Sequence, residues 1–227
     1  MTATSTAVLR CLDCGKCTSA CPVARYNRSL SPRRLMRRLG EGRAVGANDA
    51  IWACLTCMQC DTRCPQEVPI SPSVPPLRRL SRDNGDKPPA TRCSAIDQVA
   101  VLQSQAEVPQ LRLDWLEGED LRVDPEGKVL LWTGCTPYFD AFFGENGVHT
   151  LDAVKGALRI LNALDIAPAV RGDERCCGHD QLWAGDDETF EQLAARNVKM
   201  FAEAAPEMVV TVCPECQLTL LGEYQQR

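Results

Sequence analysis

The chain contains the stretch Cys11-Leu12-Asp13-Cys14-Gly15-Lys16-Cys17-Thr18-Ser19-Ala20-Cys21-Pro22, and it repeats the pattern as Cys54-Leu55-Thr56-Cys57-Met58-Gln59-Cys60-Asp61-Thr62-Arg63-Cys64-Pro65. Both stretches have the form C-x2-C-x2-C-x3-C-P. Three thiolates at that spacing wrap one face of an iron–sulfur cube, and the proline closes the turn that positions the fourth thiolate. The repeated motif therefore predicts two [4Fe–4S] clusters near the N-terminus.

The four ligands of each cluster are expected to come from both motifs. In two-cluster ferredoxins the fourth cysteine of a motif binds the other cluster. The alternative is a pair of structural zinc sites, but zinc ribbons use C-x2-C pairs separated by longer spacers and need no third and fourth cysteine before proline. We therefore assign Cys11, Cys14, Cys17 and Cys64 to one cluster, and Cys54, Cys57, Cys60 and Cys21 to the other.

Cysteine is the unusual residue in an otherwise ordinary composition, with 14 in 227 residues. A disulfide framework would need an export signal and an oxidising compartment. The residues from Met1 to Arg10 include no apolar signal region, and no apolar run approaches the roughly 20 residues that a membrane span requires. We expect the chain to have no transmembrane segment and to lie in the cytoplasm, or at a membrane through a partner. Its clustered cysteines are then expected to bind metal.

Charge is divided unevenly along the chain. Residues 1–92 contain 15 basic and 7 acidic side chains, whereas residues 93–227 contain 10 and 23. A basic segment can face nucleic acid, an anionic surface or an acidic protein, or it can be a solvated helix. Aromatic residues do not interleave with the basic ones and no nucleic-acid-binding motif is present, so we expect no nucleic-acid partner.

Local signals divide the chain into three segments. Residues 1–80 are predicted to be all-helical: Ser31 and Pro32 form a cap-and-proline helix start, and Asp49 could cap a second helix through Leu55. Residues 81–127 open with a turn-rich stretch and are predicted to be a linker. Residues 128–227 alternate between β-prone runs and helical periodicity, which predicts a small parallel α/β domain. Its expected strands are 129–132, 166–170 and 208–212, and its expected helices are 151–164 and 188–205.

Five more cysteines follow those three expected strands. Ligands in parallel sheets gather at the carboxyl ends of the strands, so these thiols are expected to converge on one metal site. Adjacent cysteines rarely bind one small ion together and suit a larger cluster. Two alternatives remain: a zinc site using four of the thiols, or a redox-active Cys176–Cys177 pair. The five are Cys135, Cys176, Cys177, Cys213 and Cys216.

The twin motif, followed by Gly134-Cys135, then Cys176-Cys177-Gly178, then Cys213-Pro214-Glu215-Cys216, resembles the iron–sulfur subunits of heterodisulfide reductase. The iron–sulfur subunit of glycerol-3-phosphate dehydrogenase and the lactate-utilisation iron–sulfur protein have similar layouts. The resemblance implies a helical two-cluster ferredoxin domain and a cysteine-rich (CCG) domain. It also implies that the five C-terminal cysteines bind a third, noncubane [4Fe–4S] cluster and form a catalytic site that cleaves a disulfide.

The chain departs from the family in carrying one CCG motif where two are usual. A second CCG-domain subunit or a second copy would then complete the site. The resemblance implies an oxidoreductase subunit that receives electrons from a flavoprotein or another iron–sulfur subunit. The main alternative is a non-catalytic subunit that connects a flavoprotein dehydrogenase to a quinone or another redox complex. A regulatory sensor would need an effector-binding module, and we find none. Cys93 has no predicted role, and His179 either donates a proton near the cluster or lies at the surface.

Overall fold

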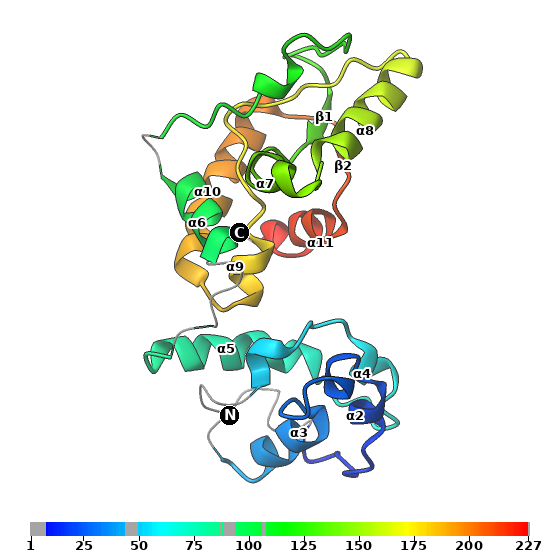
Figure 1. Cartoon of the computed structure of the whole chain (residues 1–227), viewed down its shortest axis with the longest axis vertical. Coiled ribbons are helices and arrows are strands. Elements are labelled where there is room, and N and C mark those ends of the chain that lie inside the picture. The colour runs from blue at the N-terminus through cyan, green and yellow to red at the C-terminus, as the bar shows by residue number, and fades with distance from the viewer. Residues whose placement is uncertain (1–7, 44–49, 87, 89–93, 106–107, 227) are drawn as a thin grey trace. The chain divides into compact units, whose positions relative to one another are not determined.

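A computed structural model describes residues 8–43, 50–86, 88, 94–105 and 108–226. The chain divides into two compact units (Figure 1). The first unit comprises Met1–Thr91 and Leu182–Asp187, and the second comprises Arg92–Gln181 and Glu188–Arg227. Cys93 lies outside the described residues.

The first unit is helical. Its described residues contain no strand, which agrees with the prediction for this part of the chain. The helices are α2 (Lys16–Ala20), α3 (Pro32–Gly40), α4 (Gln59–Thr62) and α5 (Val74–Asp83), with 3-10 turns at Val23–Arg25, Ala50–Ala53 and Ser71–Ser73.

Helix α3 begins as its sequence predicts. The Ser31 hydroxyl accepts a hydrogen bond from the Arg34 backbone N–H at 3.3 Å, and Pro32 occupies the first turn, where its missing N–H costs nothing. Leu35 and Met36 point from α3 into an apolar core. Burial of this face stabilises a nine-residue helix that would be marginal in isolation.

The predicted helix from Asp49 through Leu55 is wrong among the described residues. Only a 3-10 turn forms at Ala50–Ala53, and Asp49 lies outside the described part of the chain. Thr56, just beyond, has a φ of +51°, so no right-handed helix continues from this turn into the cysteine motif. The turn buries Ile51 and leaves the second cysteine motif to begin in a loop.

The second unit surrounds a short parallel sheet. Strand β1 (Val129–Trp132) pairs in parallel with β2 (Met208–Thr211), with Val129 opposite Met208. The helices in this part of the chain are α6 (Ala95–Ser104), α7 (Thr136–Phe143), α8 (Leu151–Ala163), α9 (His179–Trp183, whose last residues belong to the first unit), α10 (Asp187–Ala204) and α11 (Pro214–Gly222).

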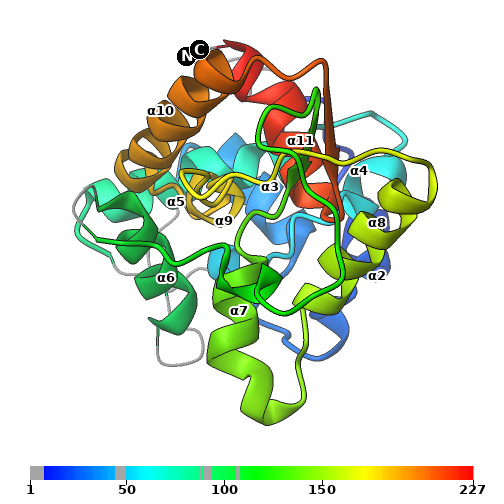
Figure 2. The same ribbon diagram turned by 90° about the horizontal axis from the view of Figure 1, so that it is seen from above.

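Alternate residues of β1 face different helices. Leu130 and Trp132 belong to a core that includes Leu193 and Met200 of α10. Leu131 points the other way, to a core that α8 supplies with Val154, Leu158 and Leu161. Helices α8 and α10 accordingly lie on opposite sides of this unit (Figure 2). The two-residue period of a strand thus places one helix against each face.

The expected strand at 166–170 is reduced to one bridge. Ala169 pairs in parallel with Leu130, and its N–H donates to the Val129 carbonyl at 2.8 Å. The carbonyl of the neighbouring Pro168 accepts instead from the Asp124 N–H at 3.1 Å. The sheet is therefore two-stranded with a bridged edge rather than three-stranded.

The segment predicted as a linker, 81–127, contributes to the second unit. It contains α6, whose Ala100 packs in the core with Leu130 and whose Gln103 is fully buried. Arg112, farther along the same segment, is also buried. Among the described residues, no helix is both long enough and apolar enough to cross a membrane.

Candidate metal centres

The two N-terminal motifs adopt the same backbone geometry. Asp13 and Thr56 occupy equivalent positions and have φ values of +52° and +51°. Each donates its backbone N–H to the sulfur two residues earlier, Cys11 or Cys54, at 3.4 Å. Such N–H···S bonds orient a thiolate ligand and influence the potential of a bound cluster.

A second left-handed residue starts the short helix of each motif. Gly15 precedes α2 with a φ of +79°, and Met58 precedes α4 with a φ of +61°. Glycine adopts this conformation readily, whereas methionine does so at a cost of about 1–2 kcal/mol. Retention of this geometry at a methionine indicates that the surrounding structure enforces the turn.

Each motif contributes three cysteines to one cavity and its fourth cysteine to the other. Ile70 lines both cavities, which are therefore neighbours. The first is lined by Cys11, Cys14, Cys17 and Cys64, and the second by Cys21, Cys54, Cys57 and Cys60. These are the two sets that the sequence analysis assigns to separate clusters.

The cysteine sulfurs are spaced too widely for a single ion. Four thiolates around one zinc, at about 2.3 Å each, would lie about 3.8 Å apart. Within the described part of the chain, one group of at least three candidate ligand side chains has all its donor atoms within 4.8 Å of one another. That group contains no cysteine. The donor set and its spacing thus fit a polynuclear cluster better than zinc.

Burial affects the thiols of these cavities when they are metal-free. It raises the pKa of Cys60 to about 12 and also raises the pKa values of Cys17 and Cys54. A desolvated thiol retains its proton at neutral pH because burial disfavours the charged thiolate. Metal binding at these cysteines would therefore release protons.

The other five predicted cysteines converge at the carboxyl end of the sheet. Cys135 caps α7 shortly after β1, and Cys213 caps α11 shortly after β2. Cys176 and Cys177 follow the bridged segment at Ala169 and are buried. The sequence prediction that these residues would meet is consistent with this arrangement.

The five cysteines lie in one packed cluster, in which Cys176, Cys177 and Cys216 are buried and Cys135 and Cys213 pack against them. The neighbouring side chains of Cys135 and Cys177 lower the pKa of Cys176 well below its usual value. The neighbouring side chains of Cys177 and Cys213 lower the pKa of Cys216 to about 4. Five sulfurs in one cluster of side chains supply the soft ligands that an iron–sulfur cluster requires.

A buried ion pair supports this site. The Arg112 guanidinium lies 2.8 Å from the Glu174 carboxylate, and neither side chain is exposed to solvent. Glu174 also accepts hydrogen bonds from the N–H of Thr133 at 3.1 Å and from the N–H of Gly134 at 2.6 Å. It therefore connects the loop before Cys135 to the loop that carries Cys176. Sequence reasoning did not assign a role to this pair.

Gln103 extends the same network. Its amide oxygen accepts from Arg112 at 2.9 Å and from the backbone N–H of Cys176 at 2.8 Å. Two glycines with left-handed backbone conformations lie close to neighbouring side chains. Gly134, with a φ of +61°, lies against the Cys216 sulfur, and Gly178, with a φ of +81°, lies against the Phe190 ring. The ligand loops are thus fixed by groups from four separate parts of the chain.

His179 lies beside the site rather than among the five cysteines. Its Nδ1 atom is 3.7 Å from Asp180 and 3.8 Å from Glu215. Burial alone would lower its pKa, but the nearby carboxylates of Asp180 and Glu215 raise it. Its side chain is 14% exposed, so it is neither a surface residue nor fully enclosed.

Comparison with known proteins identifies both units. Residues 7–68 match a 4Fe-4S dicluster domain, and residues 129–221 match a cysteine-rich domain of the CCG family. The fold and site therefore define an iron–sulfur protein in which a two-cluster ferredoxin domain is joined to a CCG domain. No solved structure matches the chain.

Relatives specify the family. One subunit of the ferredoxin:CoB-CoM heterodisulfide reductase of Methanosarcina mazei is 38% identical over 120 residues, which cover 52% of this chain and 71% of that relative. The chain belongs to this family of heterodisulfide reductase iron–sulfur subunits, and it is an iron–sulfur electron-transfer protein.

Two longer relatives match most of the chain. A probable membrane-anchored ferredoxin of Chromohalobacter salexigens is 27% identical over 94% of this chain and 37% of its own length. The EtfAB:quinone oxidoreductase of Syntrophomonas wolfei is 24% identical over 80% of this chain and 26% of its own length. The chain thus spans less than half the length of either relative.

Proposed function

We propose that this chain is an electron-transfer subunit of a heterodisulfide-reductase-like oxidoreductase. Electrons would pass through two [4Fe–4S] clusters in the first unit to a third cluster in the CCG domain, which acts on a disulfide or related sulfur substrate. The observation that carries this proposal is the grouping of five buried or half-buried cysteines in one packed cluster at the end of the sheet.

The ligands of the first two clusters follow from the cysteine sets that line the two cavities. Each cluster would be held by three cysteines of one motif and the last cysteine of the other. The shared wall at Ile70 would keep the two clusters adjacent, and this favours fast electron transfer between them. The backbone N–H groups of Asp13 and Thr56 would hold one thiolate of each set in place.

The third cluster would be bound by Cys135, Cys176, Cys177, Cys213 and Cys216. A bound iron–sulfur cluster supplies one-electron chemistry and iron sites that bind sulfur. This chain would orient the five thiolates through the network of Arg112, Glu174 and Gln103. His179, beside Glu215, is placed where it could deliver a proton to a leaving thiolate.

Partners are part of the proposal because the CCG domain, at residues 129–221, resembles one half of the two-domain site of the family. A second CCG-domain subunit, or a second copy of this chain, would supply the facing half of the site. Electrons would enter from a flavoprotein or another iron–sulfur subunit. Several relatives are named as subunits of larger enzymes, which supports an assembly of this kind in the cytoplasm or at a membrane through a partner.

A non-catalytic role has its own support. The relative named EtfAB:quinone oxidoreductase suggests a subunit that carries electrons from a flavoprotein towards a quinone. In that case the CCG domain would hold a cluster with no position open to substrate, or would serve to dock a partner.

Iron and acid-labile sulfide per chain, measured after anaerobic purification, test the proposal. Three [4Fe–4S] clusters carry about twelve irons, and we expect Cys176→Ser/Cys177→Ser to lose about four of them. Cys93→Ser is the matched control, because it removes the one cysteine without a proposed ligand role. About eight irons in the wild type and in both variants would refute the third cluster and favour the non-catalytic role.

A further inference from the structure

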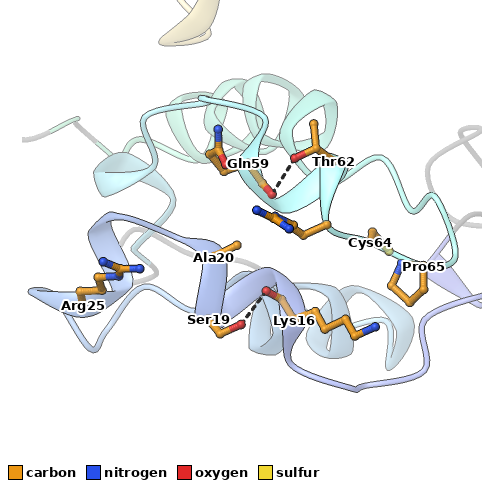
Figure 3. Close-up of a pocket in the computed structure, with 9 residues that line it drawn as sticks. Lys16, Ser19, Ala20, Arg25, Gln59, Thr62, Cys64 and Pro65 are labelled. Carbon is orange, nitrogen blue, oxygen red and sulfur yellow. Dashed lines mark hydrogen bonds between the residues drawn. The ribbon is translucent and has the colours of Figure 1, made fainter.

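A wide cleft of about 750 Å³ opens between the two motif helices of the first unit (Figure 3). Lys16, Ser19 and Ala20 of α2 form one wall, and Gln59 and Thr62 of α4 form the opposite wall. The two walls use equivalent positions of the repeated motif. The hydroxyl of Ser19 donates to the Lys16 carbonyl and that of Thr62 donates to the Gln59 carbonyl, at 2.9 and 3.2 Å.

The cleft carries positive charge and no lining acid. Lys16, Arg25 and Arg63 line it, and all three are exposed. In the part of the chain that the structure describes, none of the three forms an ion pair. Two nearby arginines are by contrast paired with acids: Arg33 lies 2.6 Å from Asp13, and Arg37 lies 3.6 Å from Glu41. The acidic residues of the two motifs also have partners outside the cleft: Asp13 pairs with Arg33, and Asp61 accepts from the Ile70 and Ser71 N–H groups. The three basic side chains therefore give the cleft a local charge of +3.

The cleft also approaches the first cluster cavity. Cys64 and its neighbour Pro65 line both the cleft and that cavity. Lys16 likewise lines both. An electron donor seated in the cleft would therefore be separated from the proposed cluster by little more than one cysteine. Because electron-transfer rates fall steeply with distance, this is a favourable place for an electron to enter or leave.

We infer that the cleft docks the acidic face of a separate redox protein, which exchanges electrons with the cluster held by Cys11, Cys14, Cys17 and Cys64. This inference rests on the proposed function and adds the place and charge of the contact. Arginine and lysine together favour carboxylates, through charge-assisted hydrogen bonds and through steering of the encounter. The cleft is broad and open and has no aromatic side chain on which a base could stack, so a protein surface suits it better than a nucleic acid.

Stopped-flow reduction of the anaerobic full chain tests this inference, with reduced flavodoxin as an acidic flavoprotein probe. The test variant is Lys16→Glu/Arg25→Glu/Arg63→Glu. The control variant, Arg122→Glu/Arg159→Glu/Lys199→Glu, changes the net charge equally at exposed positions of the second unit. We expect the second-order rate at low salt to fall about tenfold or more in the test variant and by less than twofold in the control. The difference in rate between the two variants should disappear near 1 M salt, where charges farther apart than about 3 Å are screened from one another.

Iron content and dithionite reduction separate the possible failures. If dithionite reduces both variants fully and the test variant reacts with flavodoxin at the wild-type rate, the docking inference is wrong while electron transfer stands. If dithionite fails to reduce the wild-type clusters, the proposed function itself fails. Lys16→Gln/Arg63→Gln provides a milder second variant should Arg63→Glu, next to Cys64, reduce iron content. It should slow the reaction about threefold, and an unchanged rate with full iron content would again overturn the inference.

Discussion

Replacement of Glu174 by leucine would leave a guanidinium in the interior without its carboxylate. Arg112 and Glu174 are both fully buried, and their charged atoms lie 2.8 Å apart. The substitution also removes the acceptor of the Thr133 and Gly134 N–H groups, which belong to the loop before Cys135. We therefore expect Glu174→Leu to loosen this loop and to reduce cluster binding in the CCG domain.

The size of the effect follows from the burial of the pair. Removal of one partner of a buried ion pair costs about 3–5 kcal/mol, because the remaining charge is uncompensated. Each buried N–H left without an acceptor costs a further ~1–3 kcal/mol where the loop cannot relax towards water. Because whole domains are stable by only about 5–15 kcal/mol, this change would remove a large share of the stability of the second unit.

The opposite substitution should be milder. In Arg112→Met the carboxyl group of Glu174 retains its donors at Thr133 and Gly134, and it can take up a proton to become neutral. An arginine left without its partner has no such option, because it stays protonated at any physiological pH. We expect Arg112→Met to lose about 1–3 kcal/mol of folding stability. The double variant Arg112→Met/Glu174→Leu should lose less stability than the sum of the two single losses.

Amide hydrogen exchange read by mass spectrometry measures this effect on the anaerobic full chain. A loss of about 3 kcal/mol corresponds to about a 100-fold faster exchange of the peptide that contains Thr133 and Gly134, since each ~1.4 kcal/mol is tenfold. Peptides from the first unit serve as an internal control. Equal exchange in Glu174→Leu and wild type, or a larger effect for Arg112→Met than for Glu174→Leu, would refute the reasoning.

Two further predictions concern the same site. Gly178→Ala would place a Cβ atom 2.6 Å from the buried Phe190 ring, at a backbone φ of +81°. We therefore expect this variant to lose about 2–4 kcal/mol of folding stability and about four irons per chain. The control is Gly156→Ala in α8, where no atom lies near the added Cβ, and it should leave iron content unchanged and raise the thermal midpoint. In metal-free protein, the neighbouring Cys177 and Cys213 side chains lower the pKa of Cys216 to about 4, so we expect Cys216 to be a thiolate at pH 6 and to become protonated as the pH falls through 4. Thiolate absorbance near 240 nm at pH 6 should therefore fall in Cys216→Ser and stay constant in Cys93→Ser, and equal absorbance in both would count against this charge assignment.

Predictions from sequence succeeded where the signal is local. The Ser31-Pro32 cap, the run 129–132 and the periodicity of 151–164 each correspond to an observed element, because capping, β-branching and amphipathic spacing act within a few residues. The expected helix through Leu55 forms only a 3-10 turn at Ala50–Ala53, because apolar spacing over so few residues does not distinguish a turn from a helix.

The cysteines of the candidate site could be foreseen, but the residues that hold them could not. Arg112 and Glu174 are separated by 62 positions, and Gln103 and Cys176 by 73. No periodicity or motif relates residues so far apart. Arg112 in particular lies in a segment that reads as a linker, and only the three-dimensional contact of that segment with the CCG domain reveals its role.

The interleaved cysteines of the first unit also set an order of events during synthesis. Residues of both repeats line each cavity, so neither cavity is complete when the first repeat has left the ribosome. The second cavity gains its last cysteine at Cys60 and the first at Cys64, only four positions later. Until then, Cys11, Cys14, Cys17 and Cys21 are reduced thiols that lack the other cysteines of their cluster sites. Both sets of four cysteines are therefore completed within four positions of newly made chain, and cluster loading in this unit becomes a single late step rather than two successive ones.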